Sequence, residues 1–289
     1  MSLTVTLNVF SGRPNPVWTV PEGASEELNS RIAAITTTSN LKPAGVVAGL
    51  GYRGFSVRRN EESQPIYIHG GIVDPSPTSP TLIASDREIE TWLLSTAGSQ
   101  IGDDVKAHVQ ESLQSSISDE LLLYKWPFPL AKCHPCVAAD APVYNPAIWN
   151  TAAVQPNNNC YNYANNRITN TFAQPGRATG HMYTQLNNCA AAGAVEPAAV
   201  SDGLHPVPNF AGHLAAGHGY YVALVLWPGT DFHWYRQDKV GCWSHKPGST
   251  AARNIDNAGH AIADPKIANR GPYTVFCTYM VTNHRVHIN

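Results

Sequence analysis

The residues of this chain best suited to chemistry are one cysteine and two histidines in its second half. Cys160 follows three asparagines, and either Asn158 or Asn159 would cap a helix that begins there. A cysteine in the first turn of a helix faces unpaired backbone N–H groups and the positive end of the helix dipole, which stabilise a thiolate. A lowered thiol pKa favours nucleophilic cysteine chemistry. The alternative is a free cysteine that serves as a small buried apolar group.

His233 and His245 lie on neighbouring expected strands of one hairpin over residues 232–246. If the turn places the two residues opposite each other, their side chains share one face, with Cβ atoms about 4.5–5.5 Å apart. One face of the sheet would then carry two imidazoles. The alternatives are two half-exposed histidines in an aromatic-rich sheet, or two ligands of a metal ion with Cys160 or Asp231 as a third.

Together these three residues predict a cysteine hydrolase. Cys160 would attack a carbonyl, His233 would act as base and then as acid, and His245 would orient the His233 ring. The backbone N–H of Cys160 would stabilise the oxyanion, assisted by a side-chain donor. The candidate donors and supporting residues are Asn157, Asn158, Asn159 and Gln155. The alternative orienting residues are Asp256 and Asp264, and both also suit a turn.

The order of a cysteine at a helix start, a histidine on a strand and a polar residue on the next strand resembles papain-like hydrolases of the NlpC/P60 and CHAP type. The resemblance covers roughly residues 157–280. The local sequence Asn159-Cys160-Tyr161 replaces the Asp-Cys-Ser-Gly or Gln-Cys-x-x-Trp that is usual around the nucleophile of this family. The resemblance implies an amidase or peptidase without a cofactor, and a peptide or amide substrate such as a cell-wall peptide.

The distribution of strand and helix patterns predicts an α+β protein. Residues 1–125 alternate between strand-like and helix-like segments and are expected to form a small α+β domain, with a proline-rigidified hairpin turn at residues 11–16. Residues 126–155 are rich in proline and read as a linker. Residues 156–289 are expected to form a papain-like unit, in which a helix that bears Cys160 precedes an antiparallel sheet.

A second cysteine pattern lies inside the expected linker. Cys133 and Cys136 form a C-x-x-C pair, which is compatible with a local disulfide, a redox dithiol or half of a zinc site that Cys189 and His181 would complete.

Two alternatives to the hydrolase stay open. One is a noncatalytic binding or effector protein on the same scaffold, and the other is a metal-dependent enzyme that uses the histidine and cysteine cluster.

Composition narrows the class of protein. The chain has 289 residues, of which 43% are hydrophobic and 14% charged, with a formal net charge of -2, so no basic surface indicates a nucleic-acid partner. No apolar run is long enough to span a bilayer, and the first residues do not resemble a secretion signal. Six cysteines are too few to predict a disulfide scaffold. The expected location is the cytoplasm, or outside the cell after export without a recognisable signal peptide.

Overall fold

The first strand shows how alternation in the sequence builds the N-terminal sheet in this computed structural model. In β1 (Leu3–Leu7) the three apolar side chains are buried, whereas Thr4 is exposed and Thr6 half-buried. This pattern of period two is that of a strand with one face on the core. The structure describes residues 2–39, 49–60, 63–75, 78–114 and 133–289.

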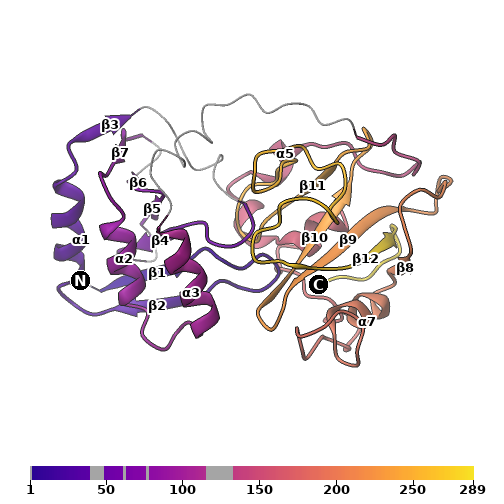
Figure 1. The fold of residues 1–289 in the computed structure, drawn as a ribbon, viewed down its shortest axis with the longest axis horizontal. Helices are drawn as coiled ribbons and strands as arrows, with labels where there is room; N and C mark the ends of the chain where they lie inside the picture. The colour runs from indigo at the N-terminus through magenta and orange to yellow at the C-terminus, as the bar shows by residue number, and fades with distance from the viewer. Residues whose placement is uncertain (1, 40–48, 61–62, 76–77, 115–132) are drawn as a thin grey trace. The chain divides into compact units, whose positions relative to one another are not determined.

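All the strand pairs of this first sheet are antiparallel, in the order β2-β1-β4-β5-β6-β7-β3. The other strands are β2 (Val17–Val20), β3 (Thr37–Ser39), β4 (Phe55–Arg58), β5 (Ile66–His69), β6 (Ile72–Asp74) and β7 (Thr81–Ile83). The helices are α1 (Ala24–Ala33), α2 (Glu88–Ser95) and α3 (Asp103–Ser112) (Figure 1). α2 and α3 each bury an apolar stripe, as Ile89 with Leu93 and Val105 with Val109 show at a spacing of four residues.

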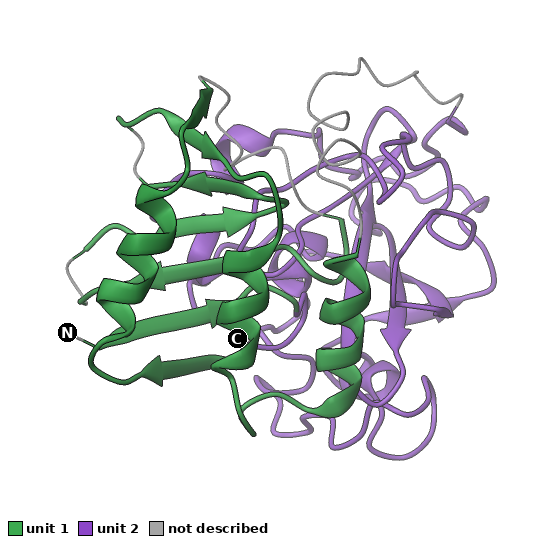
Figure 2. Cartoon of the chain, turned by 60° about the vertical axis from the view of Figure 1, so that its left-hand side comes forward, with its two compact units in different colours: residues 1–9, 15–127 green, residues 10–14, 128–289 purple. Residues whose placement is uncertain are grey.

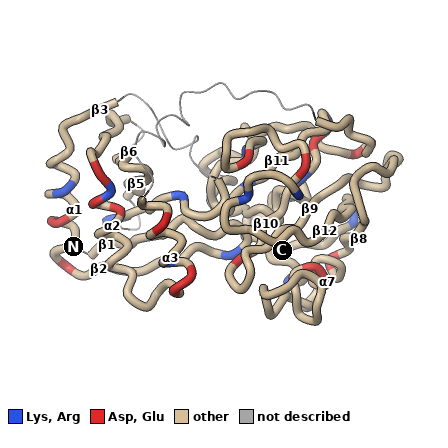
Figure 3. The backbone as a smooth tube through the Cα atoms, in the orientation of Figure 1, with Lys and Arg blue, Asp and Glu red and all other residues tan. Residues whose placement is uncertain are grey.

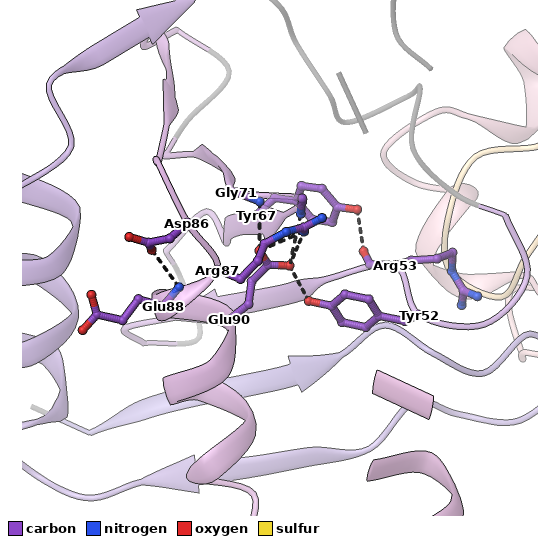
Figure 4. Close-up of polar contacts among 9 residues, drawn as sticks. Tyr52, Arg53, Tyr67, Gly71, Asp86, Arg87, Glu88 and Glu90 are labelled. Atoms are coloured by element: carbon purple, nitrogen blue, oxygen red, sulfur yellow. Dashed lines mark hydrogen bonds and ion pairs between the residues drawn. The ribbon is translucent and has the colours of Figure 1, made fainter. Parts of the chain in front are cut away.

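One buried carboxylate holds the turn between β5 and β6. Glu90 on α2 accepts hydrogen bonds from the backbone N–H groups of Gly70 (3.1 Å) and Gly71 (2.9 Å) and from the Tyr52 hydroxyl (2.6 Å). Arg87, the N-cap residue of α2, forms an ion pair with Glu90 at 3.2 Å (Figure 4). Because both charged side chains are buried, these contacts offset the cost of removing them from water.

The second sheet is antiparallel in the order β11-β10-β9-β12-β8. Its strands are β8 (His205–Val207), β9 (Tyr220–Trp227), β10 (Asp231–Gln237), β11 (Trp243–His245) and β12 (Val275–Thr282). Every residue of β9 is buried, because the strand lies between β10 and β12, and its continuous apolar sequence meets that environment. The helical segments of this half are α5 (Pro146–Trp149), η2 (Gln155–Asn157), α6 (Cys160–Ala164) and α7 (Val195–Ser201). α6 packs on β10 and β11.

Two disulfides cross-link the second sheet to distant segments. Cys133 is bonded to Cys242, and Cys189 is bonded to Cys277 on β12. The local Cys133–Cys136 disulfide that the C-x-x-C pattern allowed is therefore absent, and Cys136 is a free thiol. The bonds close sequence separations of 109 and 88 residues, which no local pattern in the sequence reveals.

The chain divides into two compact units, which Figure 2 colours separately. Unit 1 comprises residues 1–9 and 15–127, and unit 2 comprises residues 10–14 and 128–289. The predicted linker at residues 126–155 is partly outside the described residues, and its part from residue 133 onward belongs to unit 2 and includes α5. With two antiparallel sheets and several helices, the protein is of the α+β class, as the sequence predicted.

Charged side chains are sparse, and both signs are interspersed along the backbone (Figure 3). Within the described part of the chain, no helix is both long enough and apolar enough to cross a membrane.

Candidate functional site

The helix that carries Cys160 begins where the sequence predicted. Asn159 is its N-cap residue, and the Asn159 side-chain oxygen accepts the backbone N–H groups of Tyr161 (3.0 Å) and Asn162 (3.1 Å). The Asn162 side-chain oxygen accepts the backbone N–H of Asn159 in return, at 3.2 Å. This reciprocal capping satisfies N–H groups that the helix itself leaves unpaired, so α6 starts at Cys160 although it is only five residues long.

The surroundings of Cys160 suppress its ionisation. The residue has an exposed fraction of 0%, and this burial raises the pKa of its thiol well above the ordinary range. The Asp231 carboxylate raises the pKa further, whereas hydrogen bonds with the Trp234 backbone and the Ser11 side chain oppose the shift and are outweighed. The predicted lowering of this pKa is therefore wrong, because the desolvation of a thiolate costs more than the start of a five-residue helix contributes.

The two predicted histidines meet, although not in the predicted register. On β11, His245 pairs with Tyr235 of β10, so His233 lies two residues further along the same face of β10. The His245 Nδ1 and His233 Nε2 atoms are 2.9 Å apart, and both residues are fully buried. The contact is diagonal because the hairpin is centred one residue later in the sequence than a direct pairing of His233 with His245 would require.

A carbonyl at one end of this pair determines the direction of its hydrogen bonds when both rings are neutral. The Ile255 carbonyl can only accept, so His245 donates from Nε2 at 3.0 Å, and its Nδ1 then accepts from Nε2 of His233. His233 Nδ1 is left as an acceptor for the Ser11 hydroxyl, 2.5 Å away. Ser11 also interacts with the Cys160 thiol, so its side chain lies between that thiol and the His233 ring.

Ser11 belongs to a segment, Phe10–Pro14, that Asp231 anchors within unit 2. The Asp231 carboxylate accepts the backbone N–H groups of Ser11 (2.5 Å), Gly12 (3.2 Å) and Arg13 (3.0 Å). It also accepts the Tyr273 hydroxyl at 2.5 Å. Burial raises the pKa of Asp231, and the hydrogen bond from Tyr273, followed by those from backbone N–H groups, opposes that rise.

Only glycine fits at position 12 of this segment. A Cβ atom there would lie 2.4 Å from the Phe232 ring, which is fully buried. The Gly12 carbonyl accepts hydrogen bonds from the side-chain amides of Asn159 and Gln174, each at 2.8 Å. The predicted proline-rigidified turn at residues 11–16 is thus bound to the core of unit 2 through residues 11–13.

The four residues predicted to support an oxyanion form hydrogen bonds with nearby backbone and side-chain groups. The Asn159 amide donates to the carbonyls of Gly12 and Ala173, and the Asn158 amide donates to the Val154 carbonyl and the Asn170 side chain. The exposed Asn157 donates to the Ala153 carbonyl. The Gln155 carbonyl accepts a hydrogen bond from the Lys246 ammonium group. These contacts place the four residues in helix capping and loop closure.

The two alternative orienting residues are turn residues. Asp256 accepts backbone N–H groups of Ala258, His260 and Asn269, each at 2.9 Å. Asp264 accepts the backbone N–H of Lys266 and the Tyr279 hydroxyl. The partner that orients His245 is the carbonyl of Ile255, next to Asp256.

The predicted metal alternative has no ligand set in the described part of the chain, where no group of three or more His, Cys, Asp or Glu side chains could hold an ion. The weak candidates Cys133 and Cys136 are respectively disulfide-bonded and free.

Sequence reasoning missed the contacts of three residues of this buried network. Ser11 and Asp231 are 220 residues apart, and Lys246 donates to three backbone carbonyls, those of Gln155, Asn158 and Gly248. No local signal in the sequence identifies this role of Ser11, because Ser, Gly and Pro are also the ordinary residues of an exposed turn.

Comparison with known proteins decides the family. No family model and no solved structure matches the chain. Over 148 residues the chain is 45% identical to insoluble matrix shell protein 1 of Ruditapes philippinarum, and the match covers 93% of that protein and 50% of this chain. The chain belongs to the family of insoluble matrix shell protein 1.

Membership of this family overturns the predicted cysteine hydrolase and, with it, the thiol protease and amidase activities. The relative is named for an insoluble shell matrix, and this name states no hydrolase activity. The geometry also opposes a nucleophilic role for Cys160, because this residue is fully buried and the pKa of its thiol is raised. The similar residue types misled because a buried cysteine, serine and two histidines can also form a satisfied polar core.

Proposed function

We propose that this chain is a disulfide-stabilised structural protein of an insoluble extracellular matrix. The observation that carries this proposal is its 45% identity to insoluble matrix shell protein 1 over nearly the whole of that protein. Two disulfides support an extracellular location, because such bonds persist in oxidising compartments and are rare in the cytosol. An extracellular site replaces the cytoplasm as the favoured location.

The scaffold of unit 2 is used, in this proposal, for stability and not for turnover. The order of a cysteine-bearing helix and an antiparallel sheet supports a papain-like arrangement of α6, β10 and β11. Ser11 occupies the position between Cys160 and His233, and Asp231 fastens it there. A matrix protein benefits from this hydrogen-bonded chain of buried side chains, because each satisfied buried polar group adds to the uniqueness of the fold.

Fractionation of the producing organism tests the proposal. Extracellular material is extracted in sequence with neutral buffer, a chelator, detergent, and detergent with a reductant, and the chain is detected with an antibody in each step. The expected result is enrichment in the extracellular residue that resists neutral buffer and chelator. Recovery of the chain in the soluble cytosolic fraction, with a soluble cytosolic protein as control, contradicts the proposal.

A further inference from the structure

Three cysteines of unit 2 meet at one turn, and only two of them can be paired at a time. Cys133 is bonded to Cys242. Cys136, which two residues separate from Cys133, is a free and half-buried thiol. A free thiol in a C-x-x-C pair whose other member is already oxidised resembles the resolving position of a dithiol.

The turn that carries Cys242 lies directly against the segment that carries Cys136. Gly241 has a φ of 93°, and a Cβ atom on it would come within 1.8 Å of the His134 carbonyl oxygen and 3.1 Å of the Cys136 nitrogen. Gln237 contacts both sides, since its Oε1 lies 3.8 Å from Cys136 Sγ and its Nε2 donates to the Gly241 carbonyl at 3.2 Å. Cys136 therefore lies against the turn that carries Cys242.

We propose that Cys133, Cys136 and Cys242 form a thiol–disulfide exchange site. The Cys136 thiol first loses its proton to water, and the thiolate attacks the sulfur of Cys133. The Cys133–Cys136 bond forms, the Cys133–Cys242 bond breaks, and Cys242 leaves as a thiolate that takes up a proton. One disulfide and one thiol are present before and after, so the step requires no oxidant or reductant.

The exchange transfers the free thiol from position 136 to position 242. It also removes the cross-link between two residues that are 109 positions apart in the sequence. This inference goes beyond the proposed structural role, which requires no exchange. It also distinguishes the two free cysteines of the described chain, because Cys160 is fully buried and Cys136 is not.

The test uses the full chain, expressed through a secretory route and incubated at about pH 8, near the pKa of an ordinary thiol, with a small amount of reduced glutathione. Samples are blocked with N-ethylmaleimide, digested with trypsin and mapped by mass spectrometry without reduction. Trypsin yields the fragments 133–167 and 240–253, which the native disulfide joins. After exchange the fragments separate, Cys242 carries the label, and fragment 133–167 contains an internal disulfide.

The expected result is that labelled Cys242 accumulates at least about tenfold faster in the native chain than in Cys136→Ser, since glutathione alone must then open the bond. Cys160→Ser, the matched control, exchanges like the native chain. If Cys136→Ser fails to fold, native chain in which Cys136 has been blocked beforehand replaces it. The proposal is overturned if Cys136 is labelled while fragments 133–167 and 240–253 stay joined, or if Cys242 is released equally fast without Cys136.

Discussion

Each unit of this protein buries a carboxylate that accepts hydrogen bonds from backbone N–H groups and from a tyrosine hydroxyl. In unit 1, Glu90 receives its hydrogen bonds from Tyr52, Gly70 and Gly71, at most 38 residues away in the sequence. In unit 2, Asp231 binds the segment Phe10–Pro14, about 220 residues away. Similar local chemistry therefore stabilises one unit through nearby contacts and the other through long-range closure.

The covalent bonds follow the same division. All six cysteines come after residue 130, and both disulfides connect residues of unit 2. Unit 2 thus depends on several closures that span much of the chain, and each removes conformational freedom from the unfolded state. The stability of unit 2 therefore depends on redox conditions and on distant residues, whereas that of unit 1 depends on contacts among its own helices and strands.

Reduction of the disulfides is the largest expected effect. A native disulfide contributes about 2–5 kcal/mol to the free energy of unfolding, so a reductant lowers the stability of unit 2 by about that amount for each bond. Unit 1 has no cysteine to reduce and keeps its stability. Amide hydrogen exchange followed by mass spectrometry, with and without reductant, measures both units in one sample. An equal loss of protection in the two units would contradict this difference between them.

Removal of the carboxylate of unit 1 comes second. Glu90→Ala removes a buried carboxylate that pairs with Arg87 and accepts hydrogen bonds from three further donors, so we expect a loss of about 3–5 kcal/mol in the free energy of unfolding. Glu88→Ala on the same helix is the matched control, because Glu88 is 70% exposed and its ion pair with Arg31 contributes about 0–1 kcal/mol. Chemical denaturation of both variants gives the values. Similar losses for the two would show that the burial of Glu90 does not matter.

Removal of the negative charge of unit 2 has a smaller effect. Asp231→Asn keeps one oxygen that accepts hydrogen bonds, but its NH2 group replaces the other carboxylate oxygen and faces hydrogen-bond donors. We expect this change to lower the free energy of unfolding by about 1–3 kcal/mol at neutral pH. The control is Asp140→Asn, since Asp140 also accepts two backbone N–H groups, from Gly217 and Gly219, but is exposed. Proteolysis of the segment around Phe10–Pro14 should accelerate only in Asp231→Asn. Unchanged proteolysis there would show that Asp231 does not anchor the segment.

The smallest effect is a dependence on pH. Burial raises the pKa of Asp231 above its ordinary 3.8, so the folded state binds this proton more tightly than the unfolded state. The free energy of unfolding of the native chain should therefore rise relative to that of Asp231→Asn as pH falls through the raised pKa. The slope is at most about 1.4 kcal/mol for each pH unit between the two pKa values. Denaturant titrations from neutral pH down to about pH 4 measure the difference. A relative decrease in the stability of the native chain contradicts the sign.

The sequence alone was sufficient where neighbouring residues determine the conformation. The apolar run that became β9 and the alternation of β1 identify strands without tertiary information, because side-chain period and β-propensity act locally. The capping of α6 by Asn159 was likewise readable, since cap, N–H groups and Asn162 lie within four residues. The α+β class followed from the sum of these local patterns.

Tertiary structure decided what the chemical groups of unit 2 can do. The pKa of Cys160 depends on burial among residues of β10 and the segment Phe10–Pro14, and desolvation reverses the direction that its place on α6 predicts. The pairing of Cys133 with Cys242, and not with Cys136, depends on a turn 109 residues away. Such contacts cannot be read from local sequence, because residue type and spacing specify conformation nearby whereas burial and pairing depend on which distant segments the fold brings together.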